Sequence, residues 1–305
     1  MYCDLHCDTL TVCRDGEDAD RFTKSVNDLK NSGCKTQCFA IFTENKTEEQ
    51  FFAYADYFWQ EMRSLQDIAE PVLRRGDISR ISGEGKLACM LTAENLGFLQ
   101  GDPRGVYRIA KCGVKMASLV WNTQNAFACP NMIFKNGVPD FALREKRGLT
   151  SKGKEAVEIM NSCGIYADVS HLSDGGVKDV LEISSYPVIA SHSNAYEVCP
   201  VCRNLTDGQI KAIADSGGLA GVNFCRDFLG FDDIFEGVLA HIKHIVNVGG
   251  EDCVAFGSDF DGMSAPEGLE TCRNMPDLLN YLDCNLGGRL AEKIACGNFM
   301  RVFDN

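Results

Sequence analysis

Three of the five histidines in this 305-residue chain stand at the ends of short apolar runs that are typical of buried strands. They are His6, His171 and His192, and imidazole nitrogens are common ligands of zinc and similar divalent ions. Asp8 lies two residues after His6, and because strand side chains alternate, both point to one face and can reach the same ion. Taken alone, such a pair also fits a polar strand end in contact with solvent.

Carboxylates follow other predicted strands. Glu94 comes after the apolar run 88–91, where it can bridge two cations or, alternatively, cap a helix. Asp259 follows the run 253–258, and Asp261 is able to face the same way. A carboxylate next to a metal-bound water can accept its proton and return it to a leaving group, so Asp259 is a candidate for proton transfer. A turn acid before Gly262 is the alternative interpretation.

Arg203 lies eleven residues after His192. A guanidinium beside a metal site suits bidentate capture of a substrate carboxylate, although an ordinary surface ion pair is the alternative. Cys199 and Cys202 form a CxxC motif, but one such pair without a second is a weak signal for zinc or for redox chemistry.

Eight β-rich runs that alternate with helical patterns are expected to position these side chains. Eight is the number of strands in a (β/α)8 barrel of the TIM type, in which the carboxyl ends of the strands meet at one mouth. A long helical stripe spans 48–74, a second helix starts at Ser151, and Thr206 with Gln209 resembles a capping box. No linker or repeat interrupts the series, so residues 1–305 are predicted to form one α/β domain. The predicted strands are residues 3–9, 36–42, 87–93, 114–120, 165–169, 187–191, 218–223 and 253–258.

Composition and charge exclude several further classes of protein and of binding partner. With 45% hydrophobic residues the chain can bury a full core, and its net charge of −13 has the wrong sign for binding nucleic acid or anionic lipid. The 16 cysteines lack the spacing of a disulfide framework and are expected to be mostly reduced thiols. The sequence displays no secretory signal and no run of about 18 apolar residues, so we expect a cytoplasmic protein without a membrane partner.

The combined motifs resemble the membrane (renal-type) dipeptidase family, the zinc-dependent M19 peptidases. The resemblance extends from Asp4 to Phe303, and the order and spacing of its motifs agree with that family. The motifs are His6 with Asp8, the strand of Glu94, 148–150, 168–171, 191–196, Arg203-Asn204, 259–262, 266–269 and 297–302.

The resemblance implies a (β/α)8 barrel with two Zn²⁺ ions per subunit, although other divalent ions would suit the same ligands. It implies that one ion binds His6 and Asp8, the other His171 and His192, and that Glu94 bridges them. It further implies that Arg203 holds the substrate carboxylate, that Asp259 transfers protons, and that a metal-bridging hydroxide attacks the peptide bond. Free dipeptides, including those with a C-terminal D-residue, are then the expected substrates, and the homodimers common in the family are compatible with this chain.

One position departs from the family pattern. Many members carry a substrate-contacting histidine at the end of the fourth strand, where this sequence has Trp121 followed by Asn122. An indole donates one hydrogen bond and does not titrate near neutrality, so oxyanion assistance falls to its N–H, to Asn122 or to metal alone. Both residues are therefore candidates for substrate binding.

Two alternatives remain at this level. The same barrel and metals would suit hydrolysis of another amide, an N-acyl amino acid, a β-lactam or a lactone. A non-enzymatic alternative is a thiol-rich binding or redox protein on a barrel scaffold, in which Cys199 and Cys202 matter and the histidines do not.

Overall fold

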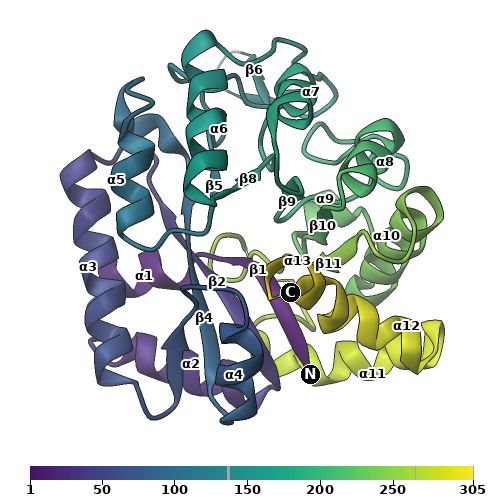
Figure 1. The fold of residues 1–305 in the computed structure, drawn as a ribbon. Helices are drawn as coiled ribbons and strands as arrows, with labels where there is room; N and C mark the ends of the chain where they lie inside the picture. Colours follow the sequence, from purple (N-terminus) through teal and green to yellow (C-terminus); the bar gives the residue numbers. More distant parts are fainter. Residues whose placement is uncertain (136–137, 265, 305) are drawn as a thin grey trace.

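A closed barrel of eight parallel strands forms the centre of the molecule, as the computed structural model of the chain shows (Figure 1). The structure describes residues 1–135, 138–264 and 266–304. Neighbouring strands pair in parallel all the way round, and the pairing of β2 with β4 closes the ring. The prediction of a (β/α)8 barrel is therefore confirmed. In barrel order the strands are β1 (Tyr2–Cys7), β2 (Cys34–Phe42), β4 (Leu87–Glu94), β5 (Met116–Ser118), β8 (Tyr166–Asp168), β9 (Ile189–Ala190), β10 (Leu219–Val222) and β11 (Val254–Phe256).

Helices surround the barrel on its outside (Figure 1). Capping boxes start α3, at Thr47 with Gln50, and α8, at Thr206 with Gln209, the latter as the sequence predicts. None of the helices in the described part of the chain is long and apolar enough to cross a membrane. The α-helices are α1 (Thr9–Asp15), α2 (Arg21–Asn31), α3 (Glu48–Ser64), α4 (Asp77–Gly83), α5 (Gly105–Lys111), α6 (Ser151–Cys163), α7 (Asp174–Ile183), α8 (Asp207–Asp215), α9 (Arg226–Leu229), α10 (Ile234–Gly249), α11 (Met275–Leu286), α12 (Gly288–Glu292) and α13 (Asn298–Phe303).

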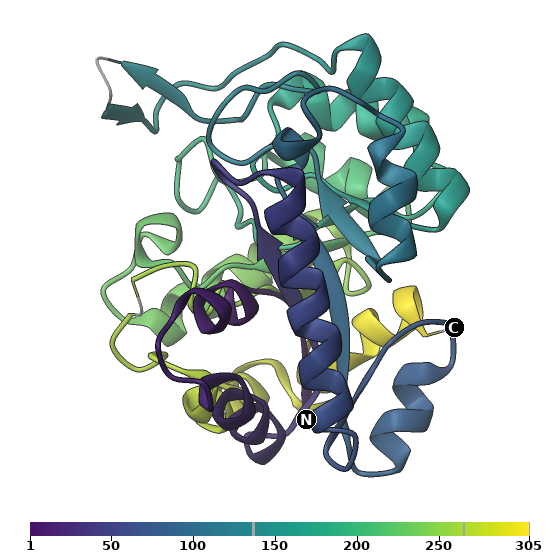
Figure 2. The same ribbon diagram turned by 90° about the vertical axis from the view of Figure 1, so that its left-hand side faces the viewer.

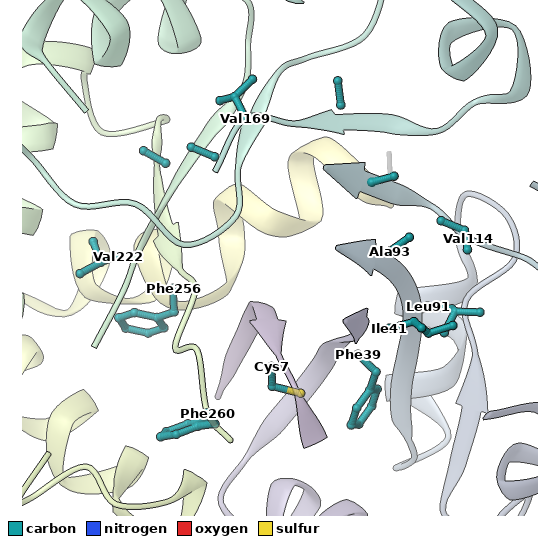
Figure 3. Packing of buried hydrophobic residues seen from close by; sticks show 14 of the residues in the cluster. Cys7, Phe39, Ile41, Leu91, Ala93, Val114, Val169, Val222, Phe256 and Phe260 are labelled. Carbon is teal, nitrogen blue, oxygen red and sulfur yellow. The ribbon is translucent and has the colours of Figure 1, made fainter. Parts of the chain in front are cut away.

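Strand alternation divides the core into two layers. Phe39 and Leu91, which are paired across β2 and β4, belong to the layer between the strands and the helices (Figure 3). Their chain neighbours Cys38 and Met90 belong to a second cluster with Cys3, Leu5 and residues of the other strands. This second cluster fills the barrel interior, as the two-residue period of a strand requires.

The barrel is closed at the amino-terminal ends of its strands by the last part of the chain. A π-helical turn, η3 (Lys293–Gly297), leads into α13, and both contribute to the interior cluster through Cys296 and Phe299. The carboxyl ends of the strands, by contrast, open toward the candidate site.

Two features differ from the sequence prediction. The helical stripe predicted to reach residue 74 ends at Ser64, and β3 (Ala69–Pro71) pairs with the first half of β4. Backbone pairing with a neighbouring strand outweighs the local periodicity here, and Pro71 would in any case have interrupted a helix. A hairpin, β6 (Ile133–Lys135) with β7 (Val138–Asp140), was not predicted and projects from the barrel (Figure 2). Two short 3₁₀ helices, η1 (Leu96–Leu99) and η2 (Cys272–Asn274), complete the elements.

Candidate metal centre

Six polar side chains converge at the carboxyl ends of the barrel strands. β1 ends just before Asp8 and carries His6, while β4 ends at Glu94. His171, His192 and Asp259 each follow a strand, namely β8, β9 and β11. All but Asp259 are buried as whole residues, and the side chain of Asp259 is only 13% exposed. Parallel closure of the barrel therefore collects at one point residues that are up to 253 positions apart in sequence.

Glu94 lies between two groups of imidazoles. Its Oε2 atom is 3.6 Å from His6 Nε2, and its Oε1 atom is 3.1 Å from His171 Nε2 and 3.7 Å from His192 Nε2. The Nε2 atoms of His171 and His192 are 3.0 Å apart. One oxygen of Glu94 thus faces His6 and the other faces His171 and His192, an arrangement that suits a ligand bridging two cations.

A second group of donors surrounds His6. Its Nε2 atom is 3.2 Å from Asp8 Oδ2 and 3.7 Å from Asp259 Oδ1. The other oxygen of Asp8, Oδ1, is buried without a hydrogen-bond partner. Gly262 packs against both carboxylates, since a Cβ atom at this position would lie 2.1 Å from Asp8 Oδ2 and 2.5 Å from Asp259 Oδ1. Only glycine permits this close approach.

Hydrogen bonds on the far side of two imidazoles orient their Nε2 lone pairs toward the cluster. His192 Nδ1 lies 2.7 Å from Ser191 Oγ, which donates to Asp168 Oδ2 at 2.5 Å. The Ser191 oxygen is therefore free to accept the Nδ1 proton of His192. His171 Nδ1 lies 2.8 Å from Asn122 Oδ1, so the same tautomer results. Such outer partners are typical of histidines that bind metals.

Two residues of the site adopt strained backbone conformations. His171 and Asp259 have φ angles of 68° and 64°, in the left-handed region that non-glycine residues rarely occupy. Each of these conformations costs roughly 1 kcal/mol. Both residues lie just after a strand, where the turn directs the side chain into the mouth of the barrel.

Burial and charge set the protonation states of the cluster. Burial, reinforced by Arg203 and His6, lowers the pKa of His171 well below its usual value, and burial with His6 and Arg203 does the same for His192. Both are thus neutral and free to act as ligands. Burial would also lower the pKa of His6, but Glu94, Asp8 and Asp259 together raise it to about 10. Burial raises the pKa of Glu94 well above its usual range.

The donor set fits divalent cations. Nitrogen and oxygen atoms of His6, Glu94 and His192 lie within 4.8 Å of one another, as do those of His6, Asp8 and Asp259. Mixed imidazole and carboxylate donors suit zinc and related ions. The unpartnered oxygen of Asp8 and the pKa of His6 both indicate that positive charge is favoured at this point.

Arg203 lies beside the cluster and is 2% exposed. Its Nη2 atom is 3.1 Å from His171 Nε2 and 3.3 Å from the carbonyl oxygen of His192, while Nη1 is buried without a partner. Its guanidinium also packs over the ring of Phe228, 5.4 Å from the centroid. Among the described residues no carboxylate forms a salt bridge with it, so the surface ion pair considered above does not occur.

A cavity of about 460 Å³ opens onto these groups. Trp121 forms part of its wall and packs edge-on against Phe42, with ring centroids 5.1 Å apart. Asn122 also lines the cavity while bonding His171. The other side chains in the wall that bear on function are Asp8, Glu94, Met132, His171, His192, Arg203, Phe228, Asp259 and Met263.

The structure brings together all nine residues that the sequence singles out for the site, with His6 just beneath the cavity wall. Asp261 behaves differently, because its carboxylate accepts hydrogen bonds from Thr9 and Arg21 and is not in either donor group. Cys199 and Cys202 are not hydrogen-bonded to each other, and Cys199 contacts the carbonyl oxygen of Asp227 instead.

Sequence reasoning missed three supporting residues. Asp168 lies in the motif of His171, and Ser191 lies in the motif of His192. An acid and a hydroxyl so close to two candidate ligands could have suggested that they orient the imidazoles. Asn223, just after β10, donates to Asp259 Oδ2 at 3.0 Å. No local pattern marks Asn223, because its partner comes from a neighbouring strand.

Comparison with known proteins agrees with this architecture. The family model "Membrane dipeptidase (Peptidase family M19)" matches residues 1–305. A Klebsiella pneumoniae protein described as "Uncharacterized protein in pqqA 5'region" is 33% identical over 264 residues, 82% of this chain and 96% of its own length. The "Uncharacterized dipeptidase C965.12" of Schizosaccharomyces pombe is 34% identical over 207 residues, 66% of this chain and 48% of its own length.

Two solved structures cover 99% of this chain and 97% of their own, each with a TM-score of 0.89. One is the dipeptidase AC, described as a metallo peptidase of family M19, at 26% identity. The other, at 25% identity, is a metallo peptidase from Rhodobacter sphaeroides bound to a phosphinate mimic of the dipeptide L-Ala-D-Ala.

Proposed function

The chain belongs to the membrane dipeptidase family, peptidase family M19, and from this we propose that its buried donor cluster holds two zinc ions for the hydrolysis of free dipeptides. Membership makes the protein a metal-dependent dipeptidase. The number and identity of the ions, the role of each residue and the stereochemistry of the substrate are our proposals.

In this proposal His6 and Asp8 hold one ion, His171 and His192 hold the other, and Glu94 bridges them. The support is the position of Glu94, whose two oxygens face His6 and the pair of neutral histidines separately. Ions at such a site act as Lewis acids on a carbonyl oxygen and supply a hydrolytic nucleophile at neutral pH. Asp168, Ser191 and Asn122 position the imidazoles.

In this proposal Arg203 binds the carboxylate of the dipeptide. One observation supports this role and, with it, the choice of free dipeptides as substrates. A buried guanidinium with an unpartnered Nη1 atom lies directly beside the donor cluster. A buried guanidinium without a direct salt-bridge partner is costly, and a substrate carboxylate would compensate for it through a charge-assisted hydrogen bond. The clamp would thereby fix the scissile bond at a set distance from the donors.

Asp259 transfers the proton. Burial, opposed by the charge of His6, raises the pKa of its carboxyl to about 6, near the pH at which acceptance and return of a proton are both efficient. Asn223 holds its Oδ2 atom, which leaves Oδ1 on the side of the donor cluster. Asp259 would accept a proton as hydrolysis begins and return it to the nitrogen of the breaking peptide bond.

Trp121 and Asn122 complete the pocket. Trp121 with Phe42 offers an apolar wall that excludes water, and Asn122 combines a place in the wall with its hydrogen bond to His171. We propose acceptance of a C-terminal D-residue as well, supported by the L-Ala-D-Ala mimic bound to the Rhodobacter sphaeroides relative.

The test is release of free amino acids from a panel of L,L- and L,D-dipeptides, using zinc-loaded and chelator-treated protein in parallel. We expect zinc-dependent release from free dipeptides and little from the same dipeptides with an amidated C-terminus. Equal hydrolysis of free and amidated dipeptides would refute the role of Arg203. Failure of protein with two bound zinc ions to cleave any dipeptide would refute the proposed substrate class.

A further inference from the structure

Two thiols meet at the end of the barrel opposite the donor cluster. Cys3 lies in the first half of β1 and points into the barrel interior, while Cys296 lies in the π-helical turn η3 that closes the barrel from below. Figure 1 shows β1 next to the C-terminal segment of the chain. The two residues are 293 positions apart, yet their sulfur atoms are 3.2 Å from each other.

This contact distinguishes the pair from the other cysteines. All 16 are free thiols in the structure, and the described residues contain no other hydrogen bond between two thiols. A disulfide requires a sulfur separation of about 2.05 Å, so an approach of about 1 Å would form the bond.

The two thiols differ in access and charge, so each has its own role. Cys3 is fully buried, and burial with the neighbouring Cys296 keeps its pKa well above the usual value. Cys296 lines a cavity of about 670 Å³ that reaches the surface and also contains Lys35. The hydrogen bond from Cys3 lowers the pKa of Cys296 despite burial, and Lys35 and the N-terminal ammonium act in the same direction. Because Cys296 borders this cavity and Cys3 does not, Cys296 is the thiol that a small oxidant reaches first, and Cys3 lies in contact with it as the partner that can resolve it.

We propose that Cys3 and Cys296 form a peroxide-oxidisable thiol pair that closes into a disulfide between the first strand and the C-terminal segment. The Cys296 thiolate attacks one oxygen of hydrogen peroxide, the O–O bond breaks, and the sulfur becomes a sulfenic acid while hydroxide leaves and takes up a proton. Cys3 sulfur then attacks the Cys296 sulfur, the S–O bond breaks, and the Cys3 proton leaves with the hydroxyl as water. Two thiols and one peroxide yield one disulfide and two waters.

Closure of this bond would link β1 to the η3 turn. Because it closes a loop of 293 positions in the unfolded chain, it is expected to raise the Tm by roughly 5 °C. Cys3 and the donor cluster lie at opposite ends of the barrel, so the bond is expected to act on stability and to leave turnover unchanged.

The experiment titrates the full-length protein with hydrogen peroxide and maps its peptides without reduction. Trypsin releases Cys3 in residues 1–14 and Cys296 in residues 294–301, and fragment ions locate the linked sulfurs. We expect a Cys3–Cys296 link, a loss of two hydrogens that dithiothreitol reverses, and the rise in Tm. Cys296→Ser and, should that variant fold poorly, Cys296→Ala must abolish both effects.

Cys13→Ser is the matched control, because Cys13 is buried and shares the tryptic peptide of Cys3. This variant should still form the link. The proposal is overturned if the exposed Cys284 is oxidised while Cys3 and Cys296 remain unlinked. It is equally overturned if the Tm of Cys296→Ser protein rises on oxidation as much as that of the unsubstituted protein.

Discussion

Gly262→Ala is expected to damage the donor cluster without unfolding the barrel. The new Cβ atom would lie 2.1 Å from Asp8 Oδ2 and 2.5 Å from Asp259 Oδ1, whereas real Cβ contacts are essentially never shorter than 3.0 Å. The Asp8 carboxylate must therefore retreat by about 1 Å, because overpacked groups shift rather than overlap. Its Oδ2 atom is the one that lies 3.2 Å from His6 Nε2, so the retreat separates two proposed ligands of one ion.

The magnitude follows from this displacement. Disturbing the surroundings of a metal ligand typically lowers affinity about 10- to 100-fold, which corresponds to about 1.4–2.7 kcal/mol. A misplacement of about 1 Å in a catalytic group costs about 100-fold in rate, so kcat/KM should fall at least that far. Since the strain is confined to a partly solvated loop at the mouth, the Tm of the metal-free protein should change by only a few degrees.

The assay measures zinc affinity by competition with a chromogenic chelator, together with dipeptide hydrolysis and the Tm. Gly208→Ala is the matched control, because a Cβ atom there meets no atom within 4 Å and the residue lies in the helix α8. That variant should keep full affinity and gain up to about 1 kcal/mol of helix stability. Wild-type zinc affinity and kcat/KM within about threefold in Gly262→Ala would refute the placement of Asp8 beside the metal.

Three further outcomes are expected. Arg203→Ala should lower kcat/KM for free dipeptides about 10- to 150-fold, the value of a charged hydrogen bond, and change hydrolysis of amidated dipeptides far less; parallel losses on both would contradict the carboxylate clamp. Ser191→Ala should lower zinc affinity about 10- to 100-fold by freeing the His192 ring, as measured by chelator competition, and unchanged affinity would remove Ser191 from the support of the site. Burial lowers the pKa of His241 in the folded protein to about 4, whereas the unfolded chain keeps the usual value of 6.5. The folded state is therefore fully stabilised by the neutral imidazole above pH 6.5, and this stabilisation is lost as the pH falls toward 4, because the unfolded chain takes up the proton first. Calorimetry should show up to about 3 kcal/mol of destabilisation over this range, and His241→Gln should flatten the profile; identical profiles would contradict the assignment.

The barrel could be predicted because each of its strands has a recognisable pattern in its own local sequence. Runs such as 87–93 are apolar and bounded by turns, and each strand of the barrel overlaps one predicted run. β3 escaped prediction because the helical periodicity of residues 48–74 continues up to it, and only pairing with β4 makes Ala69–Pro71 a strand. The β6–β7 hairpin escaped because both of its strands are short and none of their residues is buried, so they lack the hydrophobic pattern that marks a buried strand.

Of the candidate site, the sequence by itself determined the types of donor and their place at strand ends. The alternation of strand side chains was enough to put His6 and Asp8 on one face, since that property depends on neighbouring residues alone. Only the tertiary structure decided which donors face one another. It turned the Asp261 carboxylate toward Thr9 and Arg21, which are 252 and 240 positions away.

The same holds for the groups that orient the site. Asn122 bonds His171 from 49 positions away, and Asn223 holds Asp259 from the neighbouring strand. Hydropathy and spacing carry no information on such partners, because a hydrogen bond depends on the direction and distance of two side chains after the barrel has closed. The identity of the ligands is thus a local property of the sequence, whereas their orientation and protonation depend on burial and on neighbours that only the folded chain supplies.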